Sequence, residues 1–276
     1  MNKEENLEKF IDLRQKEKDF YELCGYYNGD IETNGELALI HSFAKKTDCL
    51  LDVGFNEGDV SKLFLSENDS IVIYGFEPNP MLNYDSSSVK KIFHCALSDE
   101  NGDHFSFYIS KEHHGTSSLN LRTEMNPSYR ETLERIEVKV TTLDALYDAN
   151  EINIQSSDSS IFLKIDVEGN EGKVLFGAEK FLKKYDVMGY FEYSHGWLEA
   201  KMKLQDTFYF LDSIGYDAFR ITPHGLEHIR FFHHSMENYI YQNIFFAKKG
   251  YLDSIASPIE IPWVFSETKL FKFPIT

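Results

Sequence analysis

Six short apolar runs, separated by loops and by longer helical stretches, constrain the fold of this chain more than any other feature. The runs are rich in Ile, Val, Leu and aromatic residues, and some lack alternating polar positions, which is typical of strands buried on both faces of a parallel sheet. They lie at residues 49–53, 71–76, 91–97, 161–165, 187–191 and 240–247. Helical patterns occupy residues 59–66, 171–184 and 198–213. This alternation predicts an α/β fold: a doubly wound, mostly parallel, Rossmann-like sheet with helices on both faces.

One stretch breaks the alternation. Residues 105–109 and 136–140 alternate apolar and polar side chains, as half-buried strands do, so we expect an antiparallel insertion at about residues 103–140. The chain then divides into an N-terminal helical segment (1–47), a main domain (48–249) and a C-terminal strap rich in proline and aromatic residues (250–276). We expect the first helix, residues 7–27, to lie on the main domain and the strap to pack in an extended conformation.

Composition limits the partners and the compartment. The 276 residues carry 28 Lys and Arg against 45 Asp and Glu, a formal net charge of −17, which repels phosphate backbones and anionic lipid headgroups. We therefore expect no nucleic-acid partner and no membrane partner. The three cysteines are widely spaced and form no CxxC pair, so neither a disulfide framework nor a thiolate zinc site is predicted. With no apolar targeting or spanning segment, the expected location is the cytoplasm.

The strongest motif for chemistry is the turn after the first apolar run, LDVGFNEG at residues 51–58. A strand ends in an acid, a glycine turn follows and a helix begins, which brings backbone N–H groups to the carboxyl edge of the sheet. Asp52, Gly54, Asn56 and Gly58 are therefore candidate cofactor-binding residues. The middle glycine of G-x-G-x-x-G is missing and no P-loop motif occurs, which disfavours a nicotinamide-dependent oxidoreductase. An acid beside the turn suits a cationic ligand, such as a sulfonium with its ammonium.

Further acids follow two other apolar runs. Glu77 comes about 20 residues after Gly54, the offset at which an acid accepts hydrogen bonds from ribose hydroxyls in nucleotide-binding sheets. Asp166 and Glu168 follow the run at 161–165 in the segment KIDVEG. A carboxylate there points into the same crevice, where Asp166 is a candidate to position substrate or methionine groups, to act as a base or to bind a metal.

These motifs, in this order, resemble the FkbM family of S-adenosylmethionine-dependent methyltransferases. The resemblance covers roughly residues 49–195. It rests on DVGFNEG at 52–58, FEPN at 76–79, ALSD at 96–99, VTTLD at 140–144 and KIDVEGNE at 164–171. Phe55 departs from the pattern, because the family usually has a small residue at this position.

The resemblance implies an O-methyltransferase that uses S-adenosylmethionine and acts on a hydroxyl of a carbohydrate, a glycan or a similar small polar molecule. It also implies that Asp52 and the Gly54 backbone hold the methionine part and that Glu77 holds an unmodified ribose. The residues implied along the adenine edge are Ala96, Leu97 and Ser98. The alternative is a catalytically inactive protein of this fold that serves as a binding or scaffold partner in a glycan-assembly complex.

His195 and Asp166 are the catalytic candidates. His195 follows the run at 187–191 and so falls at the same edge of the sheet as Asp166, and an imidazole titrates near neutral pH. An ordinary loop histidine, hydrogen-bonded to Glu192, is the alternative. No metal ion is predicted, although a variant of this hypothesis makes Asp166 and Glu168 ligands of a divalent ion that polarises the acceptor hydroxyl.

Polar residues of the insertion loop and of the carboxyl edge are the candidates for binding the acceptor. They are His113, His114, Ser117, Glu168 and Glu192. The insertion loop is also typical of an ordinary polar surface. A histidine-rich segment (His224, His228, His233 and His234) suggests either an aromatic, partly basic acceptor site or a metal cluster, but its spacing forms no single helical face. The sequence leaves open the identity of the acceptor and the oligomeric state.

Overall fold

The structure, a computed structural model, describes residues 3–82, 87–110, 114–121, 133–263 and 266–275. Its described strands form one sheet of ten strands and one of three. The large sheet has the order β12-β13-β10-β9-β11-β8-β7-β1-β2-β3. Its strands are β1 (Cys49–Val53), β2 (Val72–Phe76), β3 (Lys91–Phe93), β7 (Ile161–Ile165), β8 (Val187–Tyr193), β9 (Tyr216–Thr222), β10 (Gly225–His228), β11 (Gln242–Lys248), β12 (Ile259–Trp263) and β13 (Ser266–Lys272).

The direction of the strands changes across the large sheet. From β3 through β2, β1 and β7 to β8, neighbouring strands are parallel. Every pair beyond β8, through β11, β9, β10 and β13 to β12, is antiparallel. The α/β class is confirmed, but the prediction of a mostly parallel sheet is wrong. One reason is that only residues 223–224 separate β9 from β10, and such a short connection permits antiparallel pairing alone.

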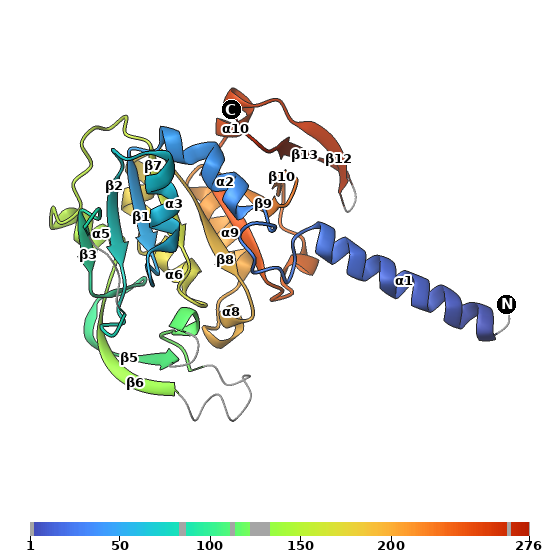
Figure 1. Cartoon of the computed structure of the whole chain (residues 1–276), viewed down its shortest axis with the longest axis horizontal. Coiled ribbons are helices and arrows are strands. Elements are labelled where there is room, and N and C mark those ends of the chain that lie inside the picture. Colours follow the sequence, from blue (N-terminus) through green and yellow to red (C-terminus); the bar gives the residue numbers. More distant parts are fainter. Residues whose placement is uncertain (1–2, 83–86, 111–113, 122–132, 264–265, 276) are drawn as a thin grey trace.

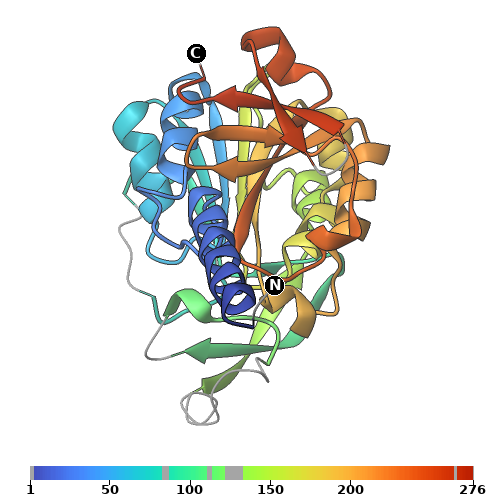
Figure 2. The same cartoon turned by 90° about the vertical axis from the view of Figure 1, so that its right-hand side faces the viewer.

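Helices cover both faces of the large sheet, as predicted (Figures 1 and 2). Leu50, Ile73 and Phe162 pack on one face against α2 (Glu36–Phe43), α3 (Asp59–Glu67) and α10 (Tyr251–Ile255). Leu51 and Leu163 pack on the other face. There they meet α5 (Leu143–Asp148), α6 (Glu171–Phe176), α7 (Glu179–Lys184) and α9 (Leu204–Ser213). Shorter helices are α8 (Gly196–Glu199) and the 3-10 turns Ala44–Lys46, His114–Thr116 and His234–Met236.

The second sheet corresponds to the expected insertion. The run predicted at 91–97 divides into β3 and β4 (Ala96–Leu97), because β4 leaves the large sheet to pair with β6 (Leu133–Thr141). β6 in turn pairs antiparallel with β5 (Gly102–Ser110). Phe107, Ile109 and Val138 form a small apolar cluster within this sheet. The insertion therefore has packing of its own beside the carboxyl ends of the main strands.

Two long predicted helices are divided. The helix expected at 171–184 breaks into α6 and α7 around Gly177, where a Cβ atom would lie 2.0 Å from the carbonyl oxygen of Ser98. The helix expected at 198–213 becomes α8 and α9. The first break brings the α6–α7 junction against the chain that follows β4, next to the insertion.

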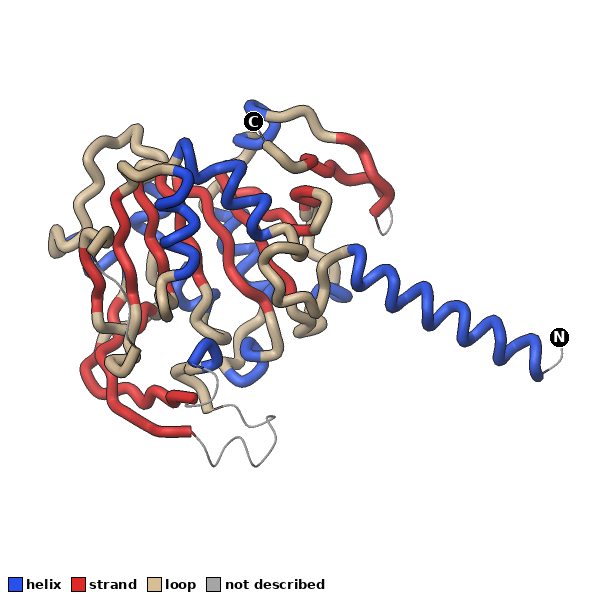
Figure 3. The backbone as a smooth tube through the Cα atoms, in the orientation of Figure 1, coloured by secondary structure: helices blue, strands red, loops and turns tan. Residues whose placement is uncertain are grey.

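The two ends of the chain differ from expectation. The first helix, α1 (Lys3–Leu23), points away from the body instead of lying on it (Figures 1 and 3), and Leu7, Phe10 and Ile11 are each more than half exposed. Its apolar residues are interspersed with charges, which leaves a stripe too weak for docking along the body. The expected extended strap begins with the helix α10 and continues as the extended strands β12 and β13, of which β13 pairs with β10. None of the described helices has the length and apolar character needed to cross a membrane.

Candidate functional site

The carboxyl ends of β1, β2 and β7 border a cleft. The space between its walls, including the open mouth, is about 600 Å³. Strand β1 lies between β2 and β7, at the point where the strand order reverses and open α/β sheets bind their ligands. The predicted site residues on its wall are Gly54, Asn56, Glu77, Ala96, Leu97, Ser117, Asp166 and Glu168.

The other predicted residues lie away from this wall. Asp52, Gly58 and Ser98 are buried behind it. Glu192 is half-buried near the end of β8, and His195 is exposed at the start of α8. His113 lies outside the described residues, and of His114 the structure describes the backbone alone, in the turn His114–Thr116.

Close backbone packing explains both glycines of the first turn. At Gly54, φ is +77° and a Cβ atom would lie 1.7 Å from the carbonyl oxygen of Asp166, so only glycine lets the turn pass β7. At Gly58, φ is +76° and a Cβ atom would lie 2.5 Å from the ring of Phe55. That ring also packs against Gly75. The unusual Phe55 therefore fills space behind the turn and is not part of the cleft wall.

Glu77 fixes two loops on the wall of the cleft. Its Oε2 accepts a hydrogen bond from the backbone N–H of Asn56 at 2.9 Å, and its Oε1 accepts one from the N–H of Asn79 at 2.8 Å. The side chain is 5% exposed, and burial raises the pKa of Glu77. Each carboxylate oxygen has two lone pairs, so both oxygens keep the capacity to accept a ligand hydroxyl.

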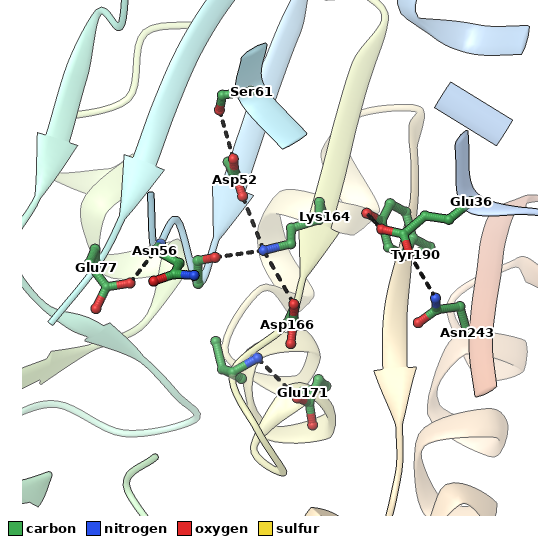
Figure 4. A network of polar contacts seen from close by, with 12 residues as sticks. Glu36, Asp52, Asn56, Ser61, Glu77, Lys164, Asp166, Glu171, Tyr190 and Asn243 are labelled. Atoms are coloured by element: carbon green, nitrogen blue, oxygen red, sulfur yellow. Dashed lines mark hydrogen bonds and ion pairs between the residues drawn. The ribbon is translucent and has the colours of Figure 1, made fainter. Parts of the chain in front are cut away.

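Lys164 connects the acids beneath the cleft (Figure 4). Its Nζ donates to the carbonyl oxygen of Gly54 at 2.6 Å and lies 3.3 Å from Asp52 Oδ1 and 3.7 Å from Asp166 Oδ2. Ser61 Oγ donates to Asp52 Oδ2 at 2.7 Å. Burial alone would lower the pKa of Lys164, but the neighbouring carboxylates of Asp52 and Asp166 raise it above its usual value. Asp52 is thus fully buried between Ser61 and the Lys164 ammonium, whereas the Asp166 side chain is 41% exposed and faces the cleft.

The loop after β7 is held by Glu171. Its carboxylate is fully buried and accepts hydrogen bonds from the N–H groups of Val167 and Gly169, each at 3.0 Å. Burial raises the pKa of Glu171 to about 7. The loop also contacts the insertion, because Ser118 Oγ donates to the carbonyl oxygen of Glu168 at 2.8 Å. One buried carboxylate and one buried hydroxyl therefore position the wall that carries Asp166.

The opposite part of the wall is apolar, and the insertion supplies some of it. Pro78, Ala96 and Leu97 lie beside Phe107 and Leu119 of the insertion. The sequence pattern identified Ala96 and Leu97 but not Phe107 or Leu119. The alternation in β5 indicated that Phe107 points inward, but no sequence signal showed which cavity it faces.

The candidate base and the histidine-rich segment lie outside the cleft wall. His195 adjoins Gly196, whose carbonyl oxygen would lie 2.3 Å from a Cβ atom on Gly169, so His195 lies near the Asp166 loop. In the histidine-rich segment, His228 Nε2 lies 3.5 Å from Asp217 Oδ1. Within the part of the chain that the structure describes, no three His, Cys, Asp or Glu side chains are placed to hold a metal ion.

A polar cluster that the sequence did not reveal lies beside Lys164 (Figure 4). The hydroxyl of Tyr190 donates to Glu36 Oε1, and Asn243 Nδ2 donates to Glu36 Oε2 at 3.2 Å. These residues come from α2, β8 and β11. No local motif joins three segments so far apart in the sequence, which is why this cluster escaped prediction.

Comparison with known proteins gives a family match over much of the chain. The profile described as the methyltransferase FkbM domain matches residues 52–218, a range that includes the end of β1 and all of β2, β7 and β8. No curated protein matches the chain.

Solved structures show more distant similarity. A methyltransferase FkbM from Methylobacillus flagellatus KT is 14% identical, with a TM-score of 0.43, and the match covers 73% of this chain but only 44% of that protein. A precorrin-6y C5,15-methyltransferase from Geobacter metallireducens GS-15 is 10% identical, with a TM-score of 0.36 and coverage of 77% and 87%. A SAM-dependent O-methyltransferase from Thermotoga maritima is 14% identical, with a TM-score of 0.32 and coverage of 77% and 64%.

Proposed function

Because the chain belongs to the FkbM methyltransferase family, we propose that it is an S-adenosylmethionine-dependent O-methyltransferase. The proposed acceptor is a hydroxyl of a carbohydrate, a glycan or a similar small polar molecule. The observation that carries the proposal is the meeting of two acids on one cleft: Glu77 at the end of β2 and Asp166 at the end of β7.

The polar and apolar parts of the cleft support the choice of cofactor. The buried Oδ1 of Asn56 lacks a donor among the described residues, and the carboxylate of Glu77 next to it keeps accepting capacity. These oxygens fit the hydroxyls of a ribose, while the apolar wall of Pro78, Ala96 and Leu97 fits a purine face. Gly54 and Asp166 remain for the amino-acid part, with Asp166 offering a carboxylate to a cationic group.

Positioning and proton removal are the tasks of the protein in such a reaction. S-adenosylmethionine supplies an electrophilic methyl group when bound. The walls around Glu77 and Asp166 hold the reactants in line, which supplies much of the acceleration in a displacement reaction. The proposed base accepts the proton of the acceptor hydroxyl as its oxygen forms the new bond to carbon. Asp166 is the candidate on the wall, and His195 is the candidate beside the adjoining loop.

The acceptor is proposed to enter over the ends of β7 and β8. Ser117 and Glu168 on the cleft wall, with Glu192 near the end of β8, offer hydrogen-bonding groups that suit a polyhydroxylated molecule. The insertion-loop candidates His113 and His114 remain predictions. Activity that is lost in EDTA and restored by Mg²⁺ would support the variant in which Asp166 and Glu168 bind a divalent ion.

Methyl transfer from isotope-labelled S-adenosylmethionine to a panel of sugars and oligosaccharides tests this function. We expect a product that gains one methyl group as an ether, identified by mass spectrometry and NMR, and we expect Asp166→Asn to reduce its formation. Transfer to nitrogen or carbon, or failure of the donor to bind at all, would overturn the proposal.

A further inference from the structure

Glu36 is a half-buried acid that neither the family motifs nor the cleft wall includes. It is the first residue of α2, and its carboxylate accepts hydrogen bonds from the Tyr190 hydroxyl and from Asn243 Nδ2. Both donors are neutral. The N-terminal end of an α-helix also stabilises negative charge. The hydrogen bonds that hold the Glu36 carboxylate therefore come from uncharged donors, and the cation that acts on it is the Lys164 ammonium of β7.

The cluster around Glu36 adjoins the acids beneath the cleft (Figure 4). Tyr190 lies directly opposite Lys164 in the β7–β8 ladder, and Lys164 contacts both Asp52 and Asp166. Three of the carboxylates that raise the pKa of Lys164, those of Asp52, Asp166 and Glu36, therefore share the one ammonium of Lys164. Burial is the main cause that raises the pKa of Glu36, and the charge of Asp166 raises it further.

Asp166 brings the excess negative charge of this network to the surface of the cleft. This side chain lines the cleft and is 41% exposed, whereas Asp52 is fully buried. On the same wall, the buried Oδ1 of Asn56 has no donor among the described residues, an independent sign that a ligand completes the site. An excess of negative charge in a partly desolvated network favours a ligand of opposite charge.

We propose that Glu36, acting together with Asp166, makes the cleft prefer a methyl donor with a positively charged sulfur to its demethylated product, in which the sulfur is uncharged. The inference rests on the proposed donor, S-adenosylmethionine, which carries a sulfonium that S-adenosylhomocysteine lacks. Glu36 is in this sense a specificity-determining residue that acts through the field at the cleft and touches no ligand. Loss of the sulfonium charge during methyl transfer then removes part of the attraction and favours release of the product.

The substitution Glu36→Gln tests this charge effect with little change in shape. The amide keeps an oxygen for the Tyr190 hydroxyl, and the Asn243 amide can turn to face the new NH₂ group. Unit charges about 10 Å apart at an effective dielectric constant of about 20 interact by an energy equivalent to roughly tenfold in affinity. We expect Glu36→Gln to weaken binding of S-adenosylmethionine about fivefold and to leave S-adenosylhomocysteine within about twofold.

Isothermal titration calorimetry on the full chain measures both ligands and also sinefungin, in which an ammonium replaces the sulfonium. Sinefungin should follow S-adenosylmethionine. Glu32→Gln, which removes an exposed acid on the loop before α2, is the matched control and should change no affinity. Asp166→Asn should weaken all three ligands, because each carries the amino-acid ammonium, and should weaken S-adenosylmethionine and sinefungin more than S-adenosylhomocysteine. That difference tests the proposal if Glu36→Gln does not fold.

The outcomes separate this inference from the proposed function. A selective loss of affinity for the two ligands with the additional positive charge supports the role of Glu36. Equal losses for all three ligands, or no loss, overturn that role and leave the proposed function standing. Failure of the wild-type protein to bind any of the three ligands overturns both.

Discussion

At the scale of single residues, Lys164 links the strands whose ends form the cleft. Its ammonium donates to the carbonyl oxygen of Gly54 and contacts Asp52 and Asp166. Because Asp52 is occupied in this way, Asp166 is the acid of this group that presents its carboxylate to a ligand. Removing Lys164 would leave Asp52 as a buried and unpaired charge, the most destabilising kind of polar change.

Single substitutions also test which residue acts as the general base. We expect His195→Ala to slow turnover about tenfold or more and to leave the affinity for S-adenosylmethionine unchanged, because a general base acts on the acceptor and not on the donor. Turnover numbers and calorimetric affinities check this, with the exposed His104→Ala as a control. Unchanged turnover in His195→Ala would discard the role and leave Asp166 as the candidate.

Individual residues differ in how readily the sequence reveals them. Glu77 and Asp166 were predicted because each immediately follows an apolar run, which fixes its place at the carboxyl edge. The sequence motif also identified Asp52 as a candidate, but it did not predict the contact with Lys164 that keeps Asp52 beneath the cleft. That contact depends on the register of β1 against β7, in which Asp52 pairs with Lys164. Register between distant strands leaves no signature in a single sequence.

At the scale of structural elements, the loop between β7 and α6 carries Asp166 of the site and also affects the stability of the protein. Glu171 holds this loop through backbone N–H groups, and the folded protein raises its pKa from an ordinary 4.5 to about 7. The folded protein therefore keeps a proton that the unfolded chain loses between these values. The free energy of unfolding consequently falls as pH rises through this window, by about 3 kcal/mol for this group.

Glu171→Gln removes this pH dependence, because an amide does not titrate. Urea unfolding at pH 5 and pH 8 should show that the wild-type protein loses about 3 kcal/mol more stability than the variant over this interval. Equal losses in the two proteins would show that Glu171 does not carry a raised pKa in the folded state.

Elements were predicted best where burial imposes a simple pattern. The runs at 49–53 and 161–165 coincide with β1 and β7, since strands covered on both faces are apolar throughout. In the antiparallel half, the run at 240–247 coincides with β11, but β9 and β10 were not predicted, because they bury charged residues that interrupt such runs. Arg220 of β9, for example, donates to Glu227 of β10 at 2.9 Å, and both side chains are almost completely buried. Because these two charged side chains pair with each other, they can lie inside the protein, whereas a hydrophobicity pattern predicts charged residues at the surface.

At the scale of the whole molecule, the cleft lies in the body of the protein, and the first helix, α1, extends away from that body. The apolar side chains of α1 that would cover the body are exposed, Leu7 by 58% and Phe10 by 59%. They therefore add little to the apolar area buried on folding. The net charge of −17 remains consistent with a cationic ligand, because Asp166 places some of that charge on the cleft wall.

A truncated variant that begins at Asp19 tests this separation. We expect its melting temperature to stay within about 2 °C of that of the full chain. A decrease of about 1 kcal/mol in the free energy of unfolding would lower the melting temperature by about 2 °C. Its affinity for S-adenosylhomocysteine should be unchanged within about twofold. A fall of several degrees, measured by differential scanning calorimetry, would show that α1 stabilises the body after all.

Binding of S-adenosylhomocysteine to the cleft is the central claim, and titration calorimetry with Glu77→Ala as the test variant addresses it most directly. We expect one equivalent to bind the wild-type protein and about tenfold or weaker binding in Glu77→Ala, because hydrogen bonds to a charged group contribute about 1.5–3 kcal/mol. The exposed Glu57→Gln, on the same turn, should bind like the wild type. The absence of binding to the wild-type protein, or equal binding to Glu77→Ala, would contradict the account.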